Sequence, residues 1–115
     1  VIDSILPMMY MPDCIKAAVD LMEAPPFKIK RHVSYNVAAM SFSAAELAEE
    51  IRKHIPEFEC DYKPDFRQEI ADSWPMSIDD RVAREEWNWR PEFDLKKMTK
   101  DMLEKLTRRS IESGL

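Results

Sequence analysis

Apolar and polar positions along the chain follow the periods of several short elements. In four segments the apolar residues recur three and four positions apart, which predicts helices with one buried face at about residues 12–24, 44–55, 80–87 and 95–106. Two segments alternate as short strands do, at residues 34–38 and 58–62. Residues 65–78 show no period and are expected to form a loop. Residues 107–115 are expected to form a flexible tail.

Capping residues support the predicted helix starts. Ser43 lies three positions before Glu46, as in a capping box. Asp79 or Asp80 is expected to cap the third helix, and Asp94 the last one. Asn88 follows the third helix, at the position where a left-handed residue often ends a helix.

The order of these elements is helix, strand, helix, strand, loop, helix, helix. It predicts an α/β fold with a small parallel sheet and about four helices. Two short strands alone make a poor sheet, and the sequence does not begin with Met. We therefore expect residues 1–106 to be one part of a larger structure that contributes the rest of the sheet.

The composition excludes several functions for these residues. The 115 residues contain a single glycine, Gly114, where average usage gives roughly eight. A glycine-rich nucleotide loop therefore cannot be formed, and no cofactor-binding residue is expected in this chain. The net charge of −5 argues against a nucleic-acid partner. No apolar run approaches the ~18 residues of a membrane span.

Metal and catalytic motifs are also missing from the sequence. The possible soft ligands lack the paired spacing of a zinc site; they are Cys14, His32, His54 and Cys60. A nucleophile elbow cannot be written without glycine. None of the three tyrosines has a lysine four positions later, as a short-chain dehydrogenase requires. We therefore expect neither a catalytic residue nor a metal ligand, and two cysteines indicate a reducing compartment.

Arg67 and Trp74 are the candidates for substrate binding. Arginine commonly binds a carboxylate or a phosphate, and a tryptophan can form the wall of a small apolar site. The alternative is structural, and composition alone favours it. Arg67 would then pair with Asp65 or Glu69, and Trp74 would be buried against the sheet.

Four segments, in this order along the chain, resemble segments of a known protein family: residues 6–14, 35–42, 67–75 and 79–89. Over about residues 6–106 the chain resembles the C-terminal part of the L-threonine 3-dehydrogenases. These enzymes belong to the extended short-chain dehydrogenase/reductase superfamily, with the nucleotide-sugar epimerases. The strings Met-Ser-Phe at 40–42 and Arg-Gln-Glu-Ile-Ala-Asp-Ser-Trp-Pro at 67–75 are typical of threonine dehydrogenase.

The resemblance implies that cofactor binding and catalysis are carried out by one part of a longer protein and substrate binding by another. An N-terminal Rossmann half would bind NAD and carry the catalytic residues. It would oxidise the 3-hydroxyl of L-threonine to give 2-amino-3-oxobutanoate. The present chain would supply the substrate-binding part and be inactive alone. Trp74 would line the threonine site. Arg67 stands where related epimerases bind nucleotide phosphates, which threonine lacks.

The resemblance also implies a homodimer of the full-length enzyme. Its location would be the cytoplasm, or the mitochondrial matrix in a eukaryote. Two alternatives remain open. The chain could belong to another extended short-chain enzyme, such as a nucleotide-sugar epimerase. It could also be a non-catalytic module that binds a protein partner through exposed Met and Trp side chains.

Overall fold

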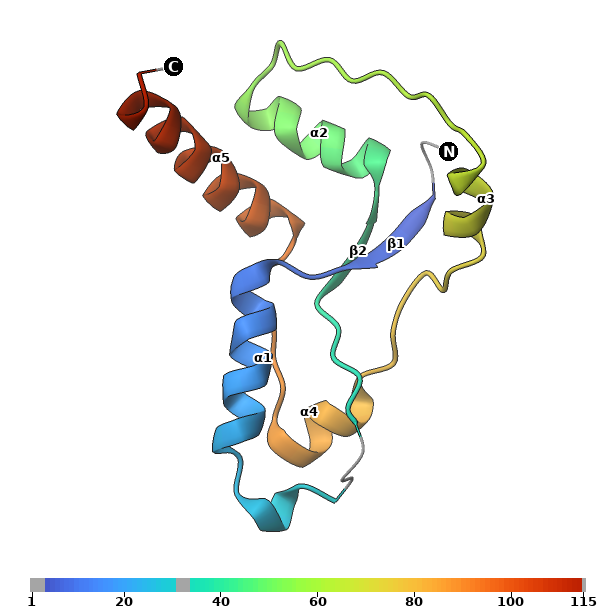
Figure 1. The fold of residues 1–115 in the computed structure, drawn as a ribbon, viewed down its shortest axis with the longest axis vertical. Coiled ribbons are helices and arrows are strands. Elements are labelled where there is room, and N and C mark those ends of the chain that lie inside the picture. Colours follow the sequence, from blue (N-terminus) through green and yellow to red (C-terminus); the bar gives the residue numbers. More distant parts are fainter. Residues whose placement is uncertain (1–3, 31–33, 115) are drawn as a thin grey trace.

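The structure, a computed structural model, describes residues 4–30 and 34–114 (Figure 1). The elements in chain order are β1 (Ile5–Met8), α1 (Met11–Glu23), a 3₁₀ turn η1 (Pro26–Lys28), β2 (Met40–Ser43), α2 (Ala44–His54), α3 (Arg67–Asp72), α4 (Arg81–Trp87) and α5 (Leu95–Glu112). This confirms the α/β class and the four predicted helices. The additional helix, α3, falls in the predicted loop, because six residues are too few to show a helical period.

The two strands pair in an antiparallel ladder, so the prediction of a parallel sheet was wrong. Ile5 lies opposite Ser43, and Met8 lies opposite Met40. Residues 34–38 are not a strand, because side chains bind the backbone of Ala38. Its N–H donates to the Asp80 carboxylate at 3.3 Å, and its carbonyl accepts from the Trp89 indole at 2.9 Å. Those groups are then unavailable to a neighbouring strand.

The second predicted strand, residues 58–62, is irregular as well. The predicted alternation holds only in part: Phe58 and Tyr62 are half-buried, but Cys60, on the same predicted face, is exposed. Among the described residues, however, no strand runs beside this segment to complete a ladder. Without a hydrogen-bonding neighbour, nothing holds the segment in the extended conformation that would turn all three side chains inward.

The main buried cluster lies between α1 and α4, and it consists of Ala17, Ala83, Trp87 and Trp89. Asn88 adopts the left-handed conformation predicted for it, with φ 58° and ψ 38°. Asparagine tolerates this conformation better than most residues do. The turn leads the chain back over the end of α4, where the Trp89 amide bonds to the Ala83 carbonyl at 3.3 Å. Trp89 is completely buried there.

A buried carboxylate ties α1 to the connection before α5. Asp13, in the first turn of α1, is completely buried. Its two oxygens accept from the backbone amides of Glu92 and Phe93, at 2.9 and 3.0 Å. Aspartate is rarely buried to this extent unless its charge is satisfied, and here two peptide dipoles satisfy it.

Helix α5 packs beside α2 (Figure 1). The capping box at Ser43 and Glu46 begins α2 as predicted. Asp94 begins α5, since its side chain accepts from the amide of Lys97 at 2.8 Å. The tail predicted from residue 107 was placed too early, because α5 continues to Glu112. Neither proline nor glycine interrupts the helix before Gly114, which has a φ of 71° and ends it.

Tyr10 joins the start of α1 to α5. Its hydroxyl donates to the Asp101 carboxylate at 2.8 Å, and Lys105 donates to the same oxygen at 2.8 Å. The Lys105 and Tyr10 hydrogen bonds lower the pKa of Asp101 below its ordinary value. The Asp101 hydrogen bond in turn raises the pKa of Tyr10.

Removing the Tyr10 hydroxyl should therefore raise the pKa of Asp101. A carboxyl group with a lowered pKa stabilises the fold above its unfolded-state pKa, and it loses that effect as the pH falls through the folded-state value. In Tyr10→Phe this loss should be smaller and should be complete at a higher pH, while Lys105 still keeps the pKa of Asp101 below normal. NMR titration of the Asp101 carboxyl carbon in the full-length protein measures this. An unchanged midpoint would show that the Tyr10 hydrogen bond has no effect on ionisation.

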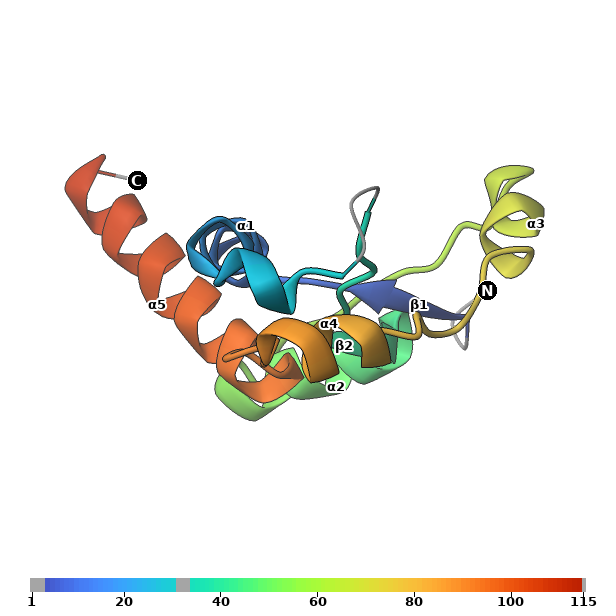
Figure 2. The same cartoon turned by 90° about the horizontal axis from the view of Figure 1, so that it is seen from below.

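The chain is more open than a compact domain of its length. Its radius of gyration is 17.3 Å, and its extents are 52 × 39 × 21 Å (Figure 2). A compact domain of this length has a radius of gyration of about 13 Å. The accessible surface is 8823 Å², against about 6500 Å² for a compact monomer of this mass.

Part of this additional surface is apolar and lies on α1. Met11, Ile15, Val19 and Met22 are exposed, and they recur along one side of the helix. The helix buries its other side, which includes Asp13 and Ala17. Within the described residues, α1 is therefore packed on one side only.

Candidate functional site

The predicted substrate-binding residues lie at the two ends of α3. This helix is beside the start of β1 and apart from α1, α4 and α5 in both views (Figures 1 and 2). Ile70 lies within α3, while Phe66 is its N-cap and Trp74 lies two residues beyond its end. Phe66, Ile70 and Trp74 are four positions apart, with 74%, 50% and 57% of their surface exposed. Residues at this spacing share a helix face. The α3 segment thus presents an apolar face that no described residue buries.

Arg67 binds Asp65, one of the two structural partners considered from the sequence. Its Nε lies 3.1 and 3.0 Å from the two carboxylate oxygens, and its Nη2 lies 2.5 Å from one of them. The Arg67 amide also donates to Asp65, at 2.9 Å. The side-chain hydrogen bond lowers the pKa of Asp65 and raises that of Arg67. Because both groups are exposed, this local pair adds little stability.

Trp74 is exposed, so the alternative of an indole buried against the sheet was wrong. Its backbone continues the last turn of α3, with its amide 3.1 Å from the Ala71 carbonyl. The hydroxyl of the preceding residue, Ser73, donates to the Ile70 carbonyl at 2.6 Å. Pro75 then fixes the direction in which the chain leaves. Trp74 is thus an exposed indole whose backbone is hydrogen-bonded to the last turn of α3.

A wide cleft of about 800 Å³ lies elsewhere, between α1, η1 and α4. It does not include Arg67 or Trp74. Charged side chains of both signs line it, and three of them are in ion pairs. Lys16 binds Asp20, and Arg84 binds Asp80, at 2.7 and 2.8 Å. We therefore place the candidate site at α3 and not in this cleft.

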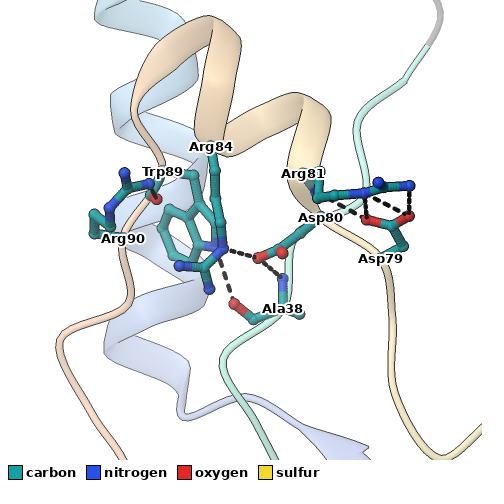
Figure 3. A network of polar contacts seen from close by, with 7 residues as sticks. All are labelled: Ala38, Asp79, Asp80, Arg81, Arg84, Trp89 and Arg90. Atoms are coloured by element: carbon teal, nitrogen blue, oxygen red, sulfur yellow. Dashed lines mark hydrogen bonds and ion pairs between the residues drawn. The ribbon is translucent and has the colours of Figure 1, made fainter.

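The carboxylates before α4 form a second polar network, which Figure 3 shows. Asp79 and Asp80 were both candidate caps, but neither forms a standard side-chain cap. Asp79 binds the amide of Arg81 at 3.1 Å and also its guanidinium, as Asp65 binds Arg67. Asp80 instead links Ala38 to Arg84. This network attaches Ala38 to the start of α4.

The four possible metal ligands are not brought together as far as the structure describes them. Cys14 and Cys60 are both exposed free thiols. His54 lies in the last turn of α2, and His32 is outside the described residues. No group of three His, Cys, Asp or Glu side chains suited to a metal occurs in residues 4–30 and 34–114. Over the same residues, no helix is long and apolar enough to cross a membrane.

Known proteins are similar in sequence to this chain over most of its length. The mitochondrial L-threonine 3-dehydrogenase of Sus scrofa is 52% identical over 99 residues, which are 85% of this chain and 26% of that protein. An uncharacterized epimerase/dehydratase of Staphylococcus haemolyticus is 47% identical over 102 residues, which are 88% of this chain and 32% of that protein. No protein-family model matches the chain.

Solved structures share the fold as well. The holo form of the GalE-like L-threonine dehydrogenase from Cupriavidus necator matches with a TM-score of 0.88 and 52% identity. The match covers 92% of this chain and 34% of that one. Fold and sequence together define the class: the chain corresponds to a C-terminal portion of an extended short-chain dehydrogenase. Within that class, the proteins that it matches at 48–52% identity include the L-threonine dehydrogenases of Sus scrofa, Bos taurus and Cupriavidus necator. It spans only about a quarter to a third of their length.

Sequence reasoning missed the residues that hold α3 in place. Ser4 hydrogen-bonds to both Gln68 and Asp72, across more than 60 residues of sequence. The spacing of four between Gln68 and Asp72 would have placed them on one helix face, had residues 67–72 been predicted as a helix. Nothing in the sequence indicates Ser4 as their partner.

Proposed function

We propose that this chain is the substrate-binding part of an NAD-dependent L-threonine 3-dehydrogenase, within a longer protein that oxidises threonine to 2-amino-3-oxobutanoate. The observation that carries the proposal is the 52% identity to threonine dehydrogenases over most of the chain. The exposed apolar face of α3 supports the proposal, because apolar side chains that no other described part of the chain buries are free to contact a small substrate. The chain by itself is expected to be inactive.

The residues of this chain do not fit NAD. A dinucleotide site needs glycines where the backbone approaches the pyrophosphate. Gly114 is the only glycine in the sequence, and it ends α5 with no other atom close to where its side chain would be. The cofactor would therefore be bound by other residues of the longer protein.

A Rossmann half is the partner that we propose for the open surface. The chain exposes about 2300 Å² more than a compact monomer of its mass, and the apolar side of α1 contributes to this area. A surface of that size corresponds to a large interface within one protein. Burial of α1 against a Rossmann half would also explain why its apolar residues are on the side that faces away from the core.

At α3, we propose that Trp74 covers the substrate and that Arg67 contacts its carboxylate. Threonine offers a methyl group to an indole and a carboxylate to a guanidinium. Arg67 is the first residue of α3, and the Trp74 amide bonds to the Ala71 carbonyl in its last turn, so the two residues flank one short helix. Arg67 would have to exchange Asp65 for the substrate.

Replacing Arg67 should therefore raise the KM for threonine. Loss of one exposed charge-assisted hydrogen bond predicts a rise of about tenfold in Arg67→Ala of the full-length enzyme, with the KM for NAD unchanged. Arg81→Ala is the matched control, because Arg81 binds Asp79 with the same local geometry on α4. Steady-state kinetics of both variants decide the point. Equal effects would remove Arg67 from the site.

The proposed function is tested with the full-length protein that contains this chain. We expect NAD-dependent oxidation of L-threonine and no turnover of a UDP-sugar. The principal alternative is an epimerase or dehydratase, which the similarity to the Staphylococcus haemolyticus protein favours. Turnover of the UDP-sugar without threonine oxidation would establish it. Absence of both activities, with no glycine-rich loop elsewhere in the protein, would favour a protein-binding module.

The proposed location follows from the relatives. The protein from Sus scrofa is named as mitochondrial, so a eukaryotic form would act in the mitochondrial matrix. A bacterial form would act in the cytoplasm.

A further inference from the structure

Three side chains attach α3 to the start of β1, and we call them the Ser4 cluster. The Ser4 hydroxyl donates to Asp72 Oδ1 at 2.5 Å. Gln68 Nε2 donates to the Ser4 hydroxyl at 2.6 Å and to Asp72 Oδ1 at 2.9 Å. Ser4, Gln68 and Asp72 thus form a closed triangle of hydrogen bonds. Among the described residues, the hydrogen bonds from α3 to another part of the fold pass through Ser4.

The cluster uses the side of α3 opposite to its apolar face. At 100° per residue, Gln68 and Asp72 each lie about 160° around α3 from Ile70, which forms the apolar face together with the flanking Phe66 and Trp74. Binding the polar side to Ser4 therefore turns the apolar side away from β1. This is consistent with the exposure of those three side chains.

The restraint extends from the cluster to Trp74 through the backbone. Asp72 is the last residue of α3, and the Ser73 amide bonds to the Glu69 and Ile70 carbonyls, each at 3.2 Å. The Trp74 amide continues this turn. Displacing Asp72 from Ser4 would therefore displace the backbone that carries the indole.

We propose that the Ser4 cluster is a positioning device for substrate binding: it fixes α3 against β1 so that Trp74 is held over the bound threonine. This inference rests on the proposed function. Hydrogen bonds from Ser4 and Gln68 lower the pKa of Asp72. The carboxylate is therefore ionised at neutral pH and able to accept both bonds. Ser4, Gln68 and Asp72 are positioning residues, since they act through Trp74.

The experiment uses the full-length enzyme with Asp72→Ala and Ser4→Ala. Hydrogen exchange without substrate should show faster exchange at the amides of residues 70–74. The KM for threonine should rise about fivefold, the effect of losing one net hydrogen bond, while kcat and the KM for NAD stay close to normal. Ser4→Thr and Asp72→Asn keep the hydroxyl and an acceptor oxygen, so both should remain near the unmodified enzyme. Asp79→Ala is the control for loss of an exposed carboxylate.

The outcomes separate the inference from the proposed function. Unchanged exchange at α3 would show that the cluster does not hold the helix. Faster exchange with an unchanged KM would show that holding α3 does not position the site. Equal KM values for Asp72→Ala and Asp79→Ala would likewise show that the Ser4 cluster does not position the site. Each of these results overturns the inference and leaves the proposed function intact. Failure of the unmodified enzyme to oxidise threonine would instead refute the proposed function, and the positioning role with it.

Discussion

Trp74→Ala in the full-length enzyme is expected to lower kcat/KM for threonine about thirtyfold, or about 2 kcal/mol. The indole is 57% exposed in this chain, so the fold does not depend on its burial. It supplies a large apolar surface on a restrained backbone, which suits a wall over the substrate methyl group. Steady-state kinetics with threonine and NAD varied separately should show the loss on the threonine side only.

The conservative variant Trp74→Phe serves as the control for this result. A phenyl ring keeps an aromatic wall, so most of kcat/KM should be retained. The thermal midpoint of both variants should stay within about 2 °C of the unmodified protein, as for a surface substitution. Unchanged kinetics in Trp74→Ala would show that the indole has no role in the site.

Asp13→Ala is expected to cause the largest loss of stability, about 3 kcal/mol in the free energy of unfolding. The substitution leaves the amides of Glu92 and Phe93 without the carboxylate that binds them. It also separates α1 from the connection into α5. Urea denaturation of the full-length protein measures the loss.

A matched control for Asp13 lies on the same helix. Asp20 binds Lys16 with both side chains partly exposed, so Asp20→Ala should cost less than about 1 kcal/mol. Asp13→Asn should fall between the two alanine variants, because the amide keeps one acceptor and turns a donor toward a backbone N–H. Similar losses for Asp13→Ala and Asp20→Ala would contradict the account of a buried anchor.

Local signals in the sequence were sufficient to predict most of the helices. The capping box at Ser43 and Glu46, the cap at Asp94 and the left-handed turn at Asn88 are all confirmed. Each depends on residues within four positions of one another, so the sequence contains the whole interaction. The α/β class followed from the order of such elements.

Long-range pairing could not be predicted in the same way. β1 pairs with β2 across more than 30 residues, and the predicted strand at 34–38 loses its backbone groups to Asp80 and Trp89. Asp13 was recognisable as an acid near a helix start, but its partners are about 80 residues away. Which groups meet across such distances depends on the packing of the whole chain.

The candidate site was predicted in part. The motif at residues 67–75 indicated Arg67 and Trp74, and the structure places Arg67 at the start of one short helix and Trp74 two residues beyond its end. Their roles in binding remain proposals. Composition did not distinguish a structural Arg67 from a functional one, and its pairing with Asp65 is compatible with either. Ser4, which fixes the helix, could only be found from the structure.

A crystal structure of the full-length protein with NAD and L-threonine would test the central claim most directly. We expect the Trp74 indole within about 4 Å of the threonine, the Ser4 cluster intact, and the apolar side of α1 buried against a Rossmann half. Threonine bound at a site that α3 does not reach, with Trp74 still exposed to solvent, would contradict the account.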